Sequence, residues 1–453
     1  MRKQVTLEKV LIANRGEIAV RIHRACKELG IKAVQVYSSA DRDSMAVHMA
    51  DESICIGPAP SAQSYLNKNH IIEAAKRFKV QAIHPGYGFL SENAEFAQLC
   101  QDHGFIFIGP SAHVIAQMGD KSTAKNVAKA AGVATTPGSD GIVATFEVAL
   151  QVAGKIGFPV LLKASAGGGG KGMRIVNSLS ELERAFNEAK REALSFFGDE
   201  SIYIEKYLTN IRHIEIQVLA DLEKVLVFGE RDCSIQRRNQ KLIEESPASA
   251  LDPRLKQKIA SAALKLCQHV GYQNAGTIEF ILDMDAQEFY FMEMNTRIQV
   301  EHPVTEMVTS FDLVKAQIQI ASGHVLETQQ EDLVLKGHAI ECRINAEDSK
   351  NQFMPSPGGV SEVHFPGGPG VRIDSHLFQG YTVPIYYDSM LAKVICWGSD
   401  RDEALARMRR VLHELRIEGV CTTKALHLEI LDHPKFTQGE FNTQFLTQAF
   451  NLN

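Results

Sequence analysis

The sequence lacks the features that mark several large classes of protein. It contains no apolar run of about 20 residues, the length that a helix needs to span a bilayer. Its eight cysteines are scattered without a Cys-x-x-Cys pair, so we expect free thiols in a reducing compartment. Basic residues are fewer than acidic ones, and the formal net charge of −6 offers no positive field to nucleic-acid phosphates. We therefore expect a cytoplasmic protein that binds neither membrane nor nucleic acid.

The composition is that of a large globular enzyme. Hydrophobic residues make up 45% and charged residues 23% of the 453 residues, which are ordinary proportions for a folded chain. A chain of this length exceeds the usual size of one domain and corresponds to roughly three packed units. We find no internal repeat and no low-complexity tract. The sequence therefore predicts a multidomain enzyme.

The N-terminal residues show the pattern of a strand–helix–strand unit. Apolar runs at 10–13 and 32–37 predict two parallel strands joined by an amphipathic helix. The turn before the helix has a single glycine instead of the three-glycine dinucleotide fingerprint, which weakens an NAD-binding interpretation. Further strands are predicted at 82–84 and 105–108. We expect a Rossmann-like N-terminal domain with an open parallel sheet over residues 1–119.

A smaller unit is predicted after a helical linker at residues 120–134. Residues 135–207 combine short strands and one long helix around a glycine-rich turn, which indicates a small mobile lid. Its predicted elements are strands at 160–163, 173–176 and 203–205 and a helix at 179–195.

Antiparallel hairpins dominate the large C-terminal domain that we expect over residues 208–453. Strands at 215–220 and 224–230 form one predicted hairpin, and strands at 277–282 and 289–294 form another. The expected fold class is therefore mixed, with α/β and α+β parts.

The second of these hairpins brings acidic side chains together. If it closes symmetrically about residue 286, Glu279 and Glu293 lie directly opposite each other, with Cβ atoms roughly 4.5–5.5 Å apart. Asn295 is two residues further on and shares their face. Such an oxygen-only set suits Mg²⁺ or Mn²⁺ bound together with phosphates. Two solvated glutamates with lysine partners are the alternative, but three flanking phenylalanines favour a buried setting.

A glycine-rich loop follows the predicted strand at 160–163. Four consecutive glycines at 167–170, flanked by Lys163 and Lys171, let backbone N–H groups approach phosphate oxygens. The loop is not a Walker A motif, because Gly172 stands at the Ser/Thr position and a strand follows. We interpret it as a turn that covers a triphosphate. A flexible surface hairpin is the alternative.

A polar string directly follows the acidic hairpin. It places the guanidinium of Arg297, the amide of Gln299 and the carboxylate of Glu301 beside the predicted metal, as needed to hold and deprotonate an oxyanion such as bicarbonate. In isolation, Arg297 and Glu301 could also form a simple i,i+4 ion pair.

At these residues the sequence closely resembles the biotin carboxylase family of ATP-grasp enzymes, over essentially the whole chain. The shared strings are IANRGEIA at 12–19, HPGYGFLSEN at 84–93, MGDK at 118–121, the glycine loop after Lys163, the segment 293–303 and ECRINAED at 341–348. The resemblance implies a ligase that carboxylates biotin with ATP and bicarbonate by way of carboxyphosphate. It further implies the first half-reaction of acetyl-CoA carboxylase, in fatty-acid synthesis.

The resemblance also implies roles for single residues. The implied ATP-binding residues are Lys121, Lys163, Gly169 and Gly170 at the phosphates, Glu205, Lys206, Tyr207 and Leu208 at the adenine, and His213, Gln236, Glu279 and Glu293. Glu279, Glu293 and Asn295 match the metal ligands, which agrees with the hairpin argument. Lys241, Arg297, Gln299 and the Val300 backbone should hold bicarbonate, Glu301 should deprotonate it, and Arg343 should stabilise the biotin enolate.

The implied cofactors and partners follow from the same resemblance. We expect two Mg²⁺ or Mn²⁺ ions with ATP. The chain has no Met-Lys-Met biotinylation tripeptide, so we expect biotin to arrive as a substrate on a separate biotin carboxyl carrier protein. Carboxyltransferase subunits are then further partners, and family analogy predicts a homodimer.

Two departures from the family pattern leave alternatives open. Asn239 stands where the family usually has histidine, and Asn cannot carry a positive charge. Ala166 replaces a usual glycine, which reduces the conformational freedom of the loop. The alternatives are another ATP-grasp ligase that activates a carboxylate for an amine, a carboxylase for another acyl-CoA, pyruvate or urea, and an ATP-binding regulatory paralogue without turnover.

Overall fold

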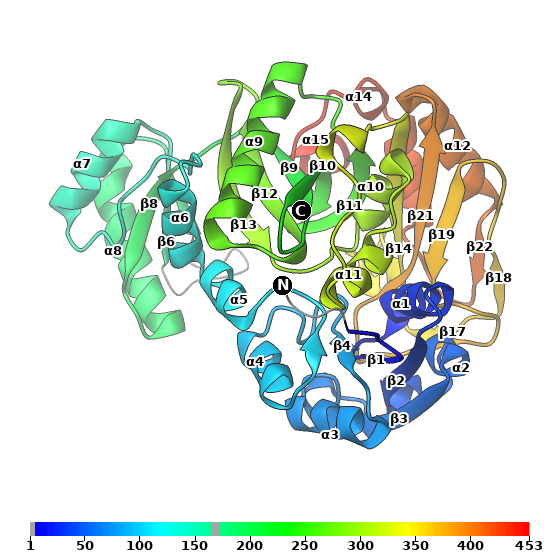
Figure 1. Ribbon diagram of the computed structural model, residues 1–453. Helices are drawn as coiled ribbons and strands as arrows, with labels where there is room; N and C mark the ends of the chain where they lie inside the picture. The colour runs from blue at the N-terminus through cyan, green and yellow to red at the C-terminus, as the bar shows by residue number, and fades with distance from the viewer. Residues whose placement is uncertain (1–4, 165–172, 453) are drawn as a thin grey trace.

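The N-terminal part of the chain is built on a parallel sheet (Figure 1). The computed structural model describes residues 5–164 and 173–452. The strand order is β3-β2-β1-β4-β5, with all neighbours parallel. The strands are β1 (Lys9–Ile12), β2 (Lys32–Ser38), β3 (Glu52–Gly57), β4 (Ala82–His84) and β5 (Ile106–Phe107). The predicted open parallel sheet is confirmed.

Helices cover this sheet and connect its strands. They are α1 (Gly16–Glu28), α2 (Met45–Met49), α3 (Lys68–Phe78), α4 (Ala94–Asp102) and α5 (Ala112–Gly119). Helix α1 buries Ile18 and Ile22 in the core that it shares with β1. Side-chain caps begin α3 and α4, because Asn67 and Asn93 each accept a hydrogen bond from a backbone N–H of the first turn.

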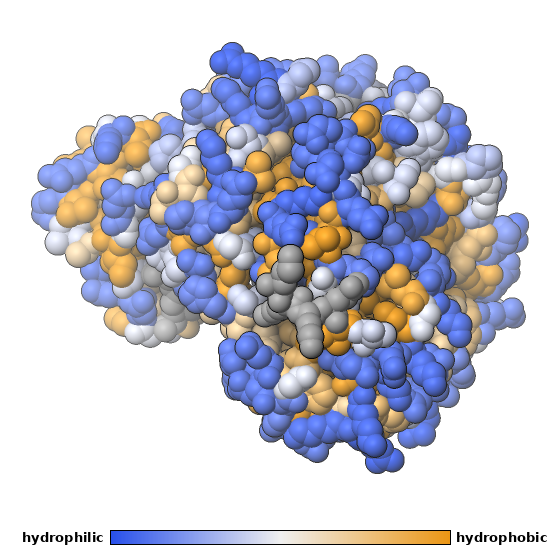
Figure 2. Space-filling model, viewed as in Figure 1, coloured by the Kyte–Doolittle hydropathy of each residue, from blue (hydrophilic) through white to orange (hydrophobic). Residues whose placement is uncertain are grey.

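A small lobe projects from the rest of the molecule at the left of Figure 1. After α6 (Lys121–Ala130), its antiparallel sheet has the order β7-β6-β8, with β6 (Val160–Ala164), β7 (Met173–Val176) and β8 (Ile202–Lys206). Helices α7 (Phe146–Ile156) and α8 (Leu179–Phe197) pack on this sheet. Figure 2 shows a recess between this lobe and the body. Ala166, Gly169, Gly170, Lys171 and Gly172 lie outside the described residues.

One long antiparallel sheet runs through the body of the molecule. Its order is β13-β12-β9-β10-β11-β14-β21-β19. The strands are β9 (Ile211–Ala220), β10 (Val225–Arg237), β11 (Gln240–Ser246), β12 (Asn274–Asp283), β13 (Glu288–Asn295), β14 (His338–Asn345), β19 (Val371–Ser375) and β21 (Met390–Gly398). Both predicted hairpins are present, and the predicted combination of α/β and α+β parts is confirmed.

Further helices and short ribbons complete the body. The helices are α9 (Pro253–Val270), α10 (His302–Thr309), α11 (Leu313–Ala321), α12 (Arg401–Glu414), α13 (Lys424–Asp432), α14 (Pro434–Thr437) and α15 (Phe445–Phe450). Small strands are β15 (Glu347–Asp348), β16 (Met354–Pro355), β17 (Gly358–Gly359), β18 (Glu362–His364), β20 (Thr382–Val383) and β22 (Arg416–Glu418). Among the helices that the structure describes, none is both long and apolar enough to cross a membrane. All eight cysteines lie in the described ranges and are free thiols, as expected.

Candidate active site

A polar pocket of about 1080 Å³ lies between the small lobe, α6 and the long sheet. Its lining includes the predicted site residues Lys121, Lys163, Glu205, His213, Gln236, Lys241, Glu279, Glu293, Asn295, Arg297, Gln299, Val300, Glu301 and Arg343. Of the described residues that were predicted, Lys206, Tyr207 and Leu208 are not in the lining, and the Lys206 side chain donates to the carbonyls of Gly157 and Phe158. The chain thus brings segments from three regions to one pocket.

The acidic hairpin has the predicted pairing for a reason that the sequence did not reveal. Glu279 lies opposite Glu293, but Phe280 lies opposite Phe291, so Met292 is an extra residue on β13. This is a β-bulge, which lets two residues of one strand face one residue of the other. Without the extra residue, Glu279 would face Met292, and Glu293 would point to the other side of the sheet.

The two carboxylates repel each other, and Glu279 is buried whereas Glu293 is partly exposed. Burial and the negative charge of Glu279 raise the pKa of Glu293 above its usual value. Burial opposes ionisation of Glu279, but Lys241 and His213 hold its pKa well below the usual range. A divalent cation would relieve the repulsion, so the two side chains fit such an ion. Asn295 donates its amide N–H to Glu279 Oε1 (2.8 Å), and its oxygen accepts from Arg297 (2.9 Å).

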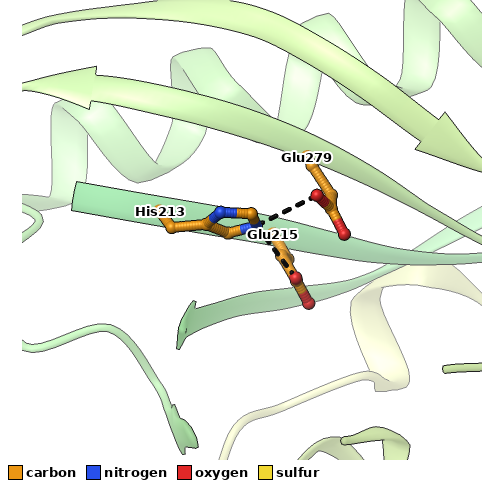
Figure 3. A group of neighbouring side chains, drawn as sticks. All are labelled: His213, Glu215 and Glu279. Carbon is orange, nitrogen blue, oxygen red and sulfur yellow. Dashed lines mark hydrogen bonds and ion pairs between the residues drawn. The ribbon is translucent and has the colours of Figure 1, made fainter. Parts of the chain in front are cut away.

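A charged histidine lies next to this pair (Figure 3). His213 and Glu215 point the same way from β9, and His213 Nε2 is 3.1 Å from Glu215 Oε1 and 3.1 Å from Glu279 Oε2. Burial disfavours the charged imidazole, but the carboxylates prevail and raise the pKa of His213 to about 9. Glu215 was not among the site residues predicted from the sequence. The spacing of two residues along a strand, which places both side chains on one face, could have indicated it.

Lys241 occupies the centre of the acidic cluster. Its Nζ lies 3.0 Å from Glu279 Oε1 and 2.8 Å from Glu301 Oε1, and it also contacts Glu215. Burial opposes its charge, but the surrounding carboxylates raise the pKa of Lys241 well above its usual value. A cation is therefore held next to the proposed base.

A fully buried arginine, Arg231, ties several strands together beneath the pocket. It donates to Glu215 Oε2 at 3.1 and 3.2 Å and to Gln299 Oε1 at 2.5 Å. It also donates to Gln217 Oε1 at 2.8 Å, Thr305 Oγ1 at 3.0 Å and Thr277 Oγ1 at 3.1 Å. The sequence analysis did not single out this residue.

The two charged residues of the polar string have different partners. Arg297 Nε donates to Glu92 Oε2 at 2.8 Å. Glu301 accepts from Lys241 and, at 3.0 Å, from Nη2 of Arg343. These partners take the place of the simple i,i+4 ion pair. Arg297 and Glu301 therefore have separate partners, and both line the pocket.

Lysines gather at the entrance that faces the small lobe. Glu205 accepts from Lys163 at 2.5 Å and also from Lys125, one helical turn after Lys121. Lys121 is 70% exposed, and its Nζ lies 4.0 Å from Glu293 Oε2. Lys125 was missed by the sequence analysis, although its i,i+4 spacing from Lys121 places both on one helix face.

The departure at Asn239 lies in a hairpin turn. Arg237 and Gln240 pair across β10 and β11, so Arg238 and Asn239 form a two-residue turn with φ of 47° and 65°. Such turns require left-handed residues and favour asparagine. Asn239 lines the pocket, and its positive φ suits the turn.

The small antiparallel lobe and the long antiparallel sheet, with lysines and carboxylates in the cleft between them, have the ATP-grasp fold. Three family models match consecutive parts of the chain. They are the biotin carboxylase N-terminal domain at residues 6–115, the carbamoyl-phosphate synthase L chain ATP binding domain at 120–329, and the biotin carboxylase C-terminal domain at 341–448. The chain belongs to the biotin carboxylase family, and it is an ATP-dependent ligase.

Full-length relatives support this assignment. Biotin carboxylase 1 of Bacillus subtilis is 56% identical over 441 residues, covering 97% of this chain and 98% of the relative. A crystal structure of a Campylobacter jejuni biotin carboxylase complex with β,γ-ATP matches with a TM-score of 0.91 at 50% identity, covering 98% and 99% of the two chains. The biotin carboxylase domain dimer of Hydrogenobacter thermophilus 2-oxoglutarate carboxylase, in complex with MgADP, ADP and bicarbonate, matches with a TM-score of 0.90 at 48% identity. The match covers 98% of each chain. The family resemblance inferred from the sequence is confirmed.

Proposed function

We propose that the chain carboxylates biotin held on a separate carrier protein, in the first half-reaction of acetyl-CoA carboxylase. The observation that carries the proposal is the convergence of Lys241, Glu301 and Arg343 on one pocket that also contains the opposed Glu279 and Glu293. Lys241 and Arg343 flank the buried Glu301 carboxylate. Such a carboxylate with cations beside it suits the capture and deprotonation of a small oxyanion. The bicarbonate bound by the Hydrogenobacter relative supports this interpretation.

Nucleotide binding is proposed for the part of the pocket near the small lobe. Lys121 and Lys163 would offset the charge of the phosphates, with Gln236 and His213 nearby. Residues 205–208 would meet the adenine, and of these Glu205 lines the pocket. Glu279 and Glu293, with Asn295, would hold Mg²⁺ or Mn²⁺. Such an ion neutralises charge that develops on transferring phosphoryl oxygens.

Bicarbonate is proposed to lie between Arg297, Gln299, Lys241 and the Val300 backbone. Glu301 takes its proton, and the bicarbonate oxygen attacks the γ-phosphorus. The O–P bond forms as the bond to ADP breaks, which gives carboxyphosphate. Its C–O bond then breaks to yield phosphate and CO₂. The phosphate takes the proton from a biotin nitrogen, and this nitrogen forms the new bond to CO₂. Arg343 stabilises the negative charge that biotin carries when its nitrogen is deprotonated.

The oligomeric state, the partner proteins and the cellular location are part of the same proposal. We propose a cytoplasmic homodimer that works with a biotin carboxyl carrier protein and carboxyltransferase subunits. The free cysteines and the dimeric Hydrogenobacter relative support this view. That relative belongs to a 2-oxoglutarate carboxylase, so a 2-oxo acid is the main alternative to acetyl-CoA as final acceptor.

Omission of single substrates tests the proposed reaction. Phosphate release from ATP is measured with Mg²⁺, bicarbonate and free biotin, each left out in turn. We expect the full rate only when all are present. ATP binding without bicarbonate-dependent phosphate release would contradict the proposal and favour a regulatory paralogue.

Arg343→Ala should lower the rate of biotin carboxylation about 10²-fold or more, because the buried guanidinium would no longer stabilise the deprotonated biotin. ATP binding, measured by calorimetry, should persist. Arg416→Ala is the control, since this arginine is largely exposed. An unchanged carboxylation rate would remove Arg343 from the mechanism.

Glu293→Gln should weaken Mn²⁺ binding in the presence of ADP about tenfold, because one of the two opposed carboxylates loses its charge. Titration followed by electron paramagnetic resonance measures bound ion without turnover. Glu288→Gln, at an exposed position of the same strand, is the matched control. Equal Mn²⁺ affinity of both variants and the unmodified protein would argue against the hairpin as metal site.

A further inference from the structure

Glu244 supports Arg343 from beneath the pocket. This glutamate of β11 is fully buried and is not among the residues that line the pocket. Arg343 donates to Glu244 Oε1 from Nε at 2.6 Å and from Nη2 at 2.5 Å. The same Nη2 lies 3.0 Å from Glu301 Oε2. The guanidinium is therefore shared between two carboxylates, of which only Glu301 faces the pocket.

A second buried acid, Glu341, lies next to Glu244. The two are cross-strand neighbours of β11 and β14, so their side chains point to the same side of the sheet. Among the described residues, neither Glu341 oxygen has a hydrogen-bond partner, and the same holds for Glu244 Oε2. Burial raises the pKa of Glu341 well above its usual value, although Lys393 opposes this shift. Burial thus favours the neutral form of Glu341 over its charged form.

Glu244 is the member of this pair that changes charge near neutrality. Burial raises its pKa to about 7, with the Arg343 guanidinium opposing that shift and the Glu301 carboxylate adding to it. The charged and titratable groups that face it are Arg343 and Glu341 on β14, Lys241 on β11, Cys233 on β10 and Glu301 at the start of α10. The burial of Cys233 keeps its thiol neutral.

We propose that Glu244 is a positioning residue for biotin carboxylation. Its negative charge holds the Arg343 guanidinium, which also pairs with Glu301. This inference rests on the proposed function. While Glu244 is charged, Arg343 keeps a fixed orientation and Glu301 remains only partly neutralised. When Glu244 is neutral, Arg343 pairs with Glu301 alone, which makes Glu301 a weaker base and draws the guanidinium away from biotin.

The sign of the pH effect follows from this arrangement. Above about pH 7 Glu244 is ionised and the arrangement is intact. As the pH falls through about 7, Glu244 takes up a proton and its hold on Arg343 is lost. The value of kcat/KM for biotin should therefore decline on the acidic side of this value, while the KM for ATP stays nearly constant.

Glu244→Gln is the direct test. At pH 8 we expect kcat/KM for biotin to fall about tenfold, with the KM for ATP within about twofold of the unmodified protein. At pH 6 the two proteins should converge, because the unmodified protein has then lost the same charge. Glu341→Gln is the matched control. It replaces a buried acid that makes no hydrogen bond to Arg343 and whose neutral form is favoured by burial, so its pH profile should follow that of the unmodified protein.

The outcomes separate the possible explanations. The inference is overturned if Glu244→Gln has the same kcat/KM for biotin as the unmodified protein at pH 8. It is also overturned if kcat/KM is reduced by the same factor at every pH. If Glu244→Gln fails to fold, Glu244→Asp replaces it. The aspartate keeps the charge, so the decline near pH 7 should persist, and its loss would also overturn the inference. If the unmodified protein does not carboxylate biotin at all, the proposed function fails instead.

Discussion

Glu301→Gln is expected to lower the rate of bicarbonate-dependent phosphate release about 10³-fold, within the range typical for loss of a general base. The carboxylate is buried between Lys241 Nζ at 2.8 Å and Arg343 Nη2 at 3.0 Å. Although burial opposes ionisation, Lys241 and Arg343 lower the pKa of Glu301, which keeps the carboxylate in the ionised form that can take a proton. Glutamine keeps the shape and an acceptor oxygen but cannot take the proton.

Steady-state rates at saturating ATP measure this loss. Nucleotide affinity should change by less than about twofold, because the contacts of Glu301 are with Lys241 and Arg343 and not with the proposed phosphate lysines Lys121 and Lys163. Glu331→Gln, at an exposed position of η3 (Gln330–Asp332), serves as control. A Glu301→Gln protein that retains a tenth of the original rate or more would exclude Glu301 as the base.

Arg231→Met is expected to lower the free energy of unfolding by about 3–5 kcal/mol, the usual effect of removing one partner of a buried ion pair. The guanidinium donates to carboxylate, amide and hydroxyl groups from several segments. Without it, the fully buried Glu215 loses a main partner and Gln299 is no longer held. Chemical denaturation followed by circular dichroism measures the effect, with Arg254→Met on the exposed side of α9 as control.

A double-mutant cycle shows whether the loss comes from the unpaired carboxylate. Combining Arg231→Met with Glu215→Gln removes the stranded charge, so we expect the double variant to be less destabilised than the sum of the single ones. Strict additivity would mean that the loss comes from the other contacts of Arg231 and not from the unpaired Glu215 carboxylate.

The sequence predicted the two opposed carboxylates because they belong to a local pattern. Glu279 and Glu293 lie on the two strands of one hairpin with a short turn, so the sequence could place them near each other. Our assumption of symmetric closure about residue 286 was nevertheless incomplete. The turn itself pairs Asp283 with Glu288, and the extra residue Met292 restores the opposed arrangement. A bulge depends on how neighbouring strands pack, which a single sequence does not display.

The residues that the sequence analysis missed are those that act across strands. Arg231 joins Glu215 on β9 to Thr305 on α10, and Glu244 meets Arg343 across 99 residues of sequence. On buried strands, polar and apolar residues alternate without showing which partners face each other. Only the strand order β9-β10-β11-β14 brings these groups together.

Transfer of an oxygen atom tests the proposed reaction most directly. Bicarbonate labelled with ¹⁸O is supplied with ATP, Mg²⁺ and biotin, and the released phosphate is examined by mass spectrometry. If bicarbonate attacks the γ-phosphorus in the pocket around Lys241 and Glu301, each phosphate carries one ¹⁸O atom and an equal amount of carboxybiotin forms. Phosphate that takes its new oxygen from water instead, at the same rate of ATP use, would contradict carboxyphosphate formation.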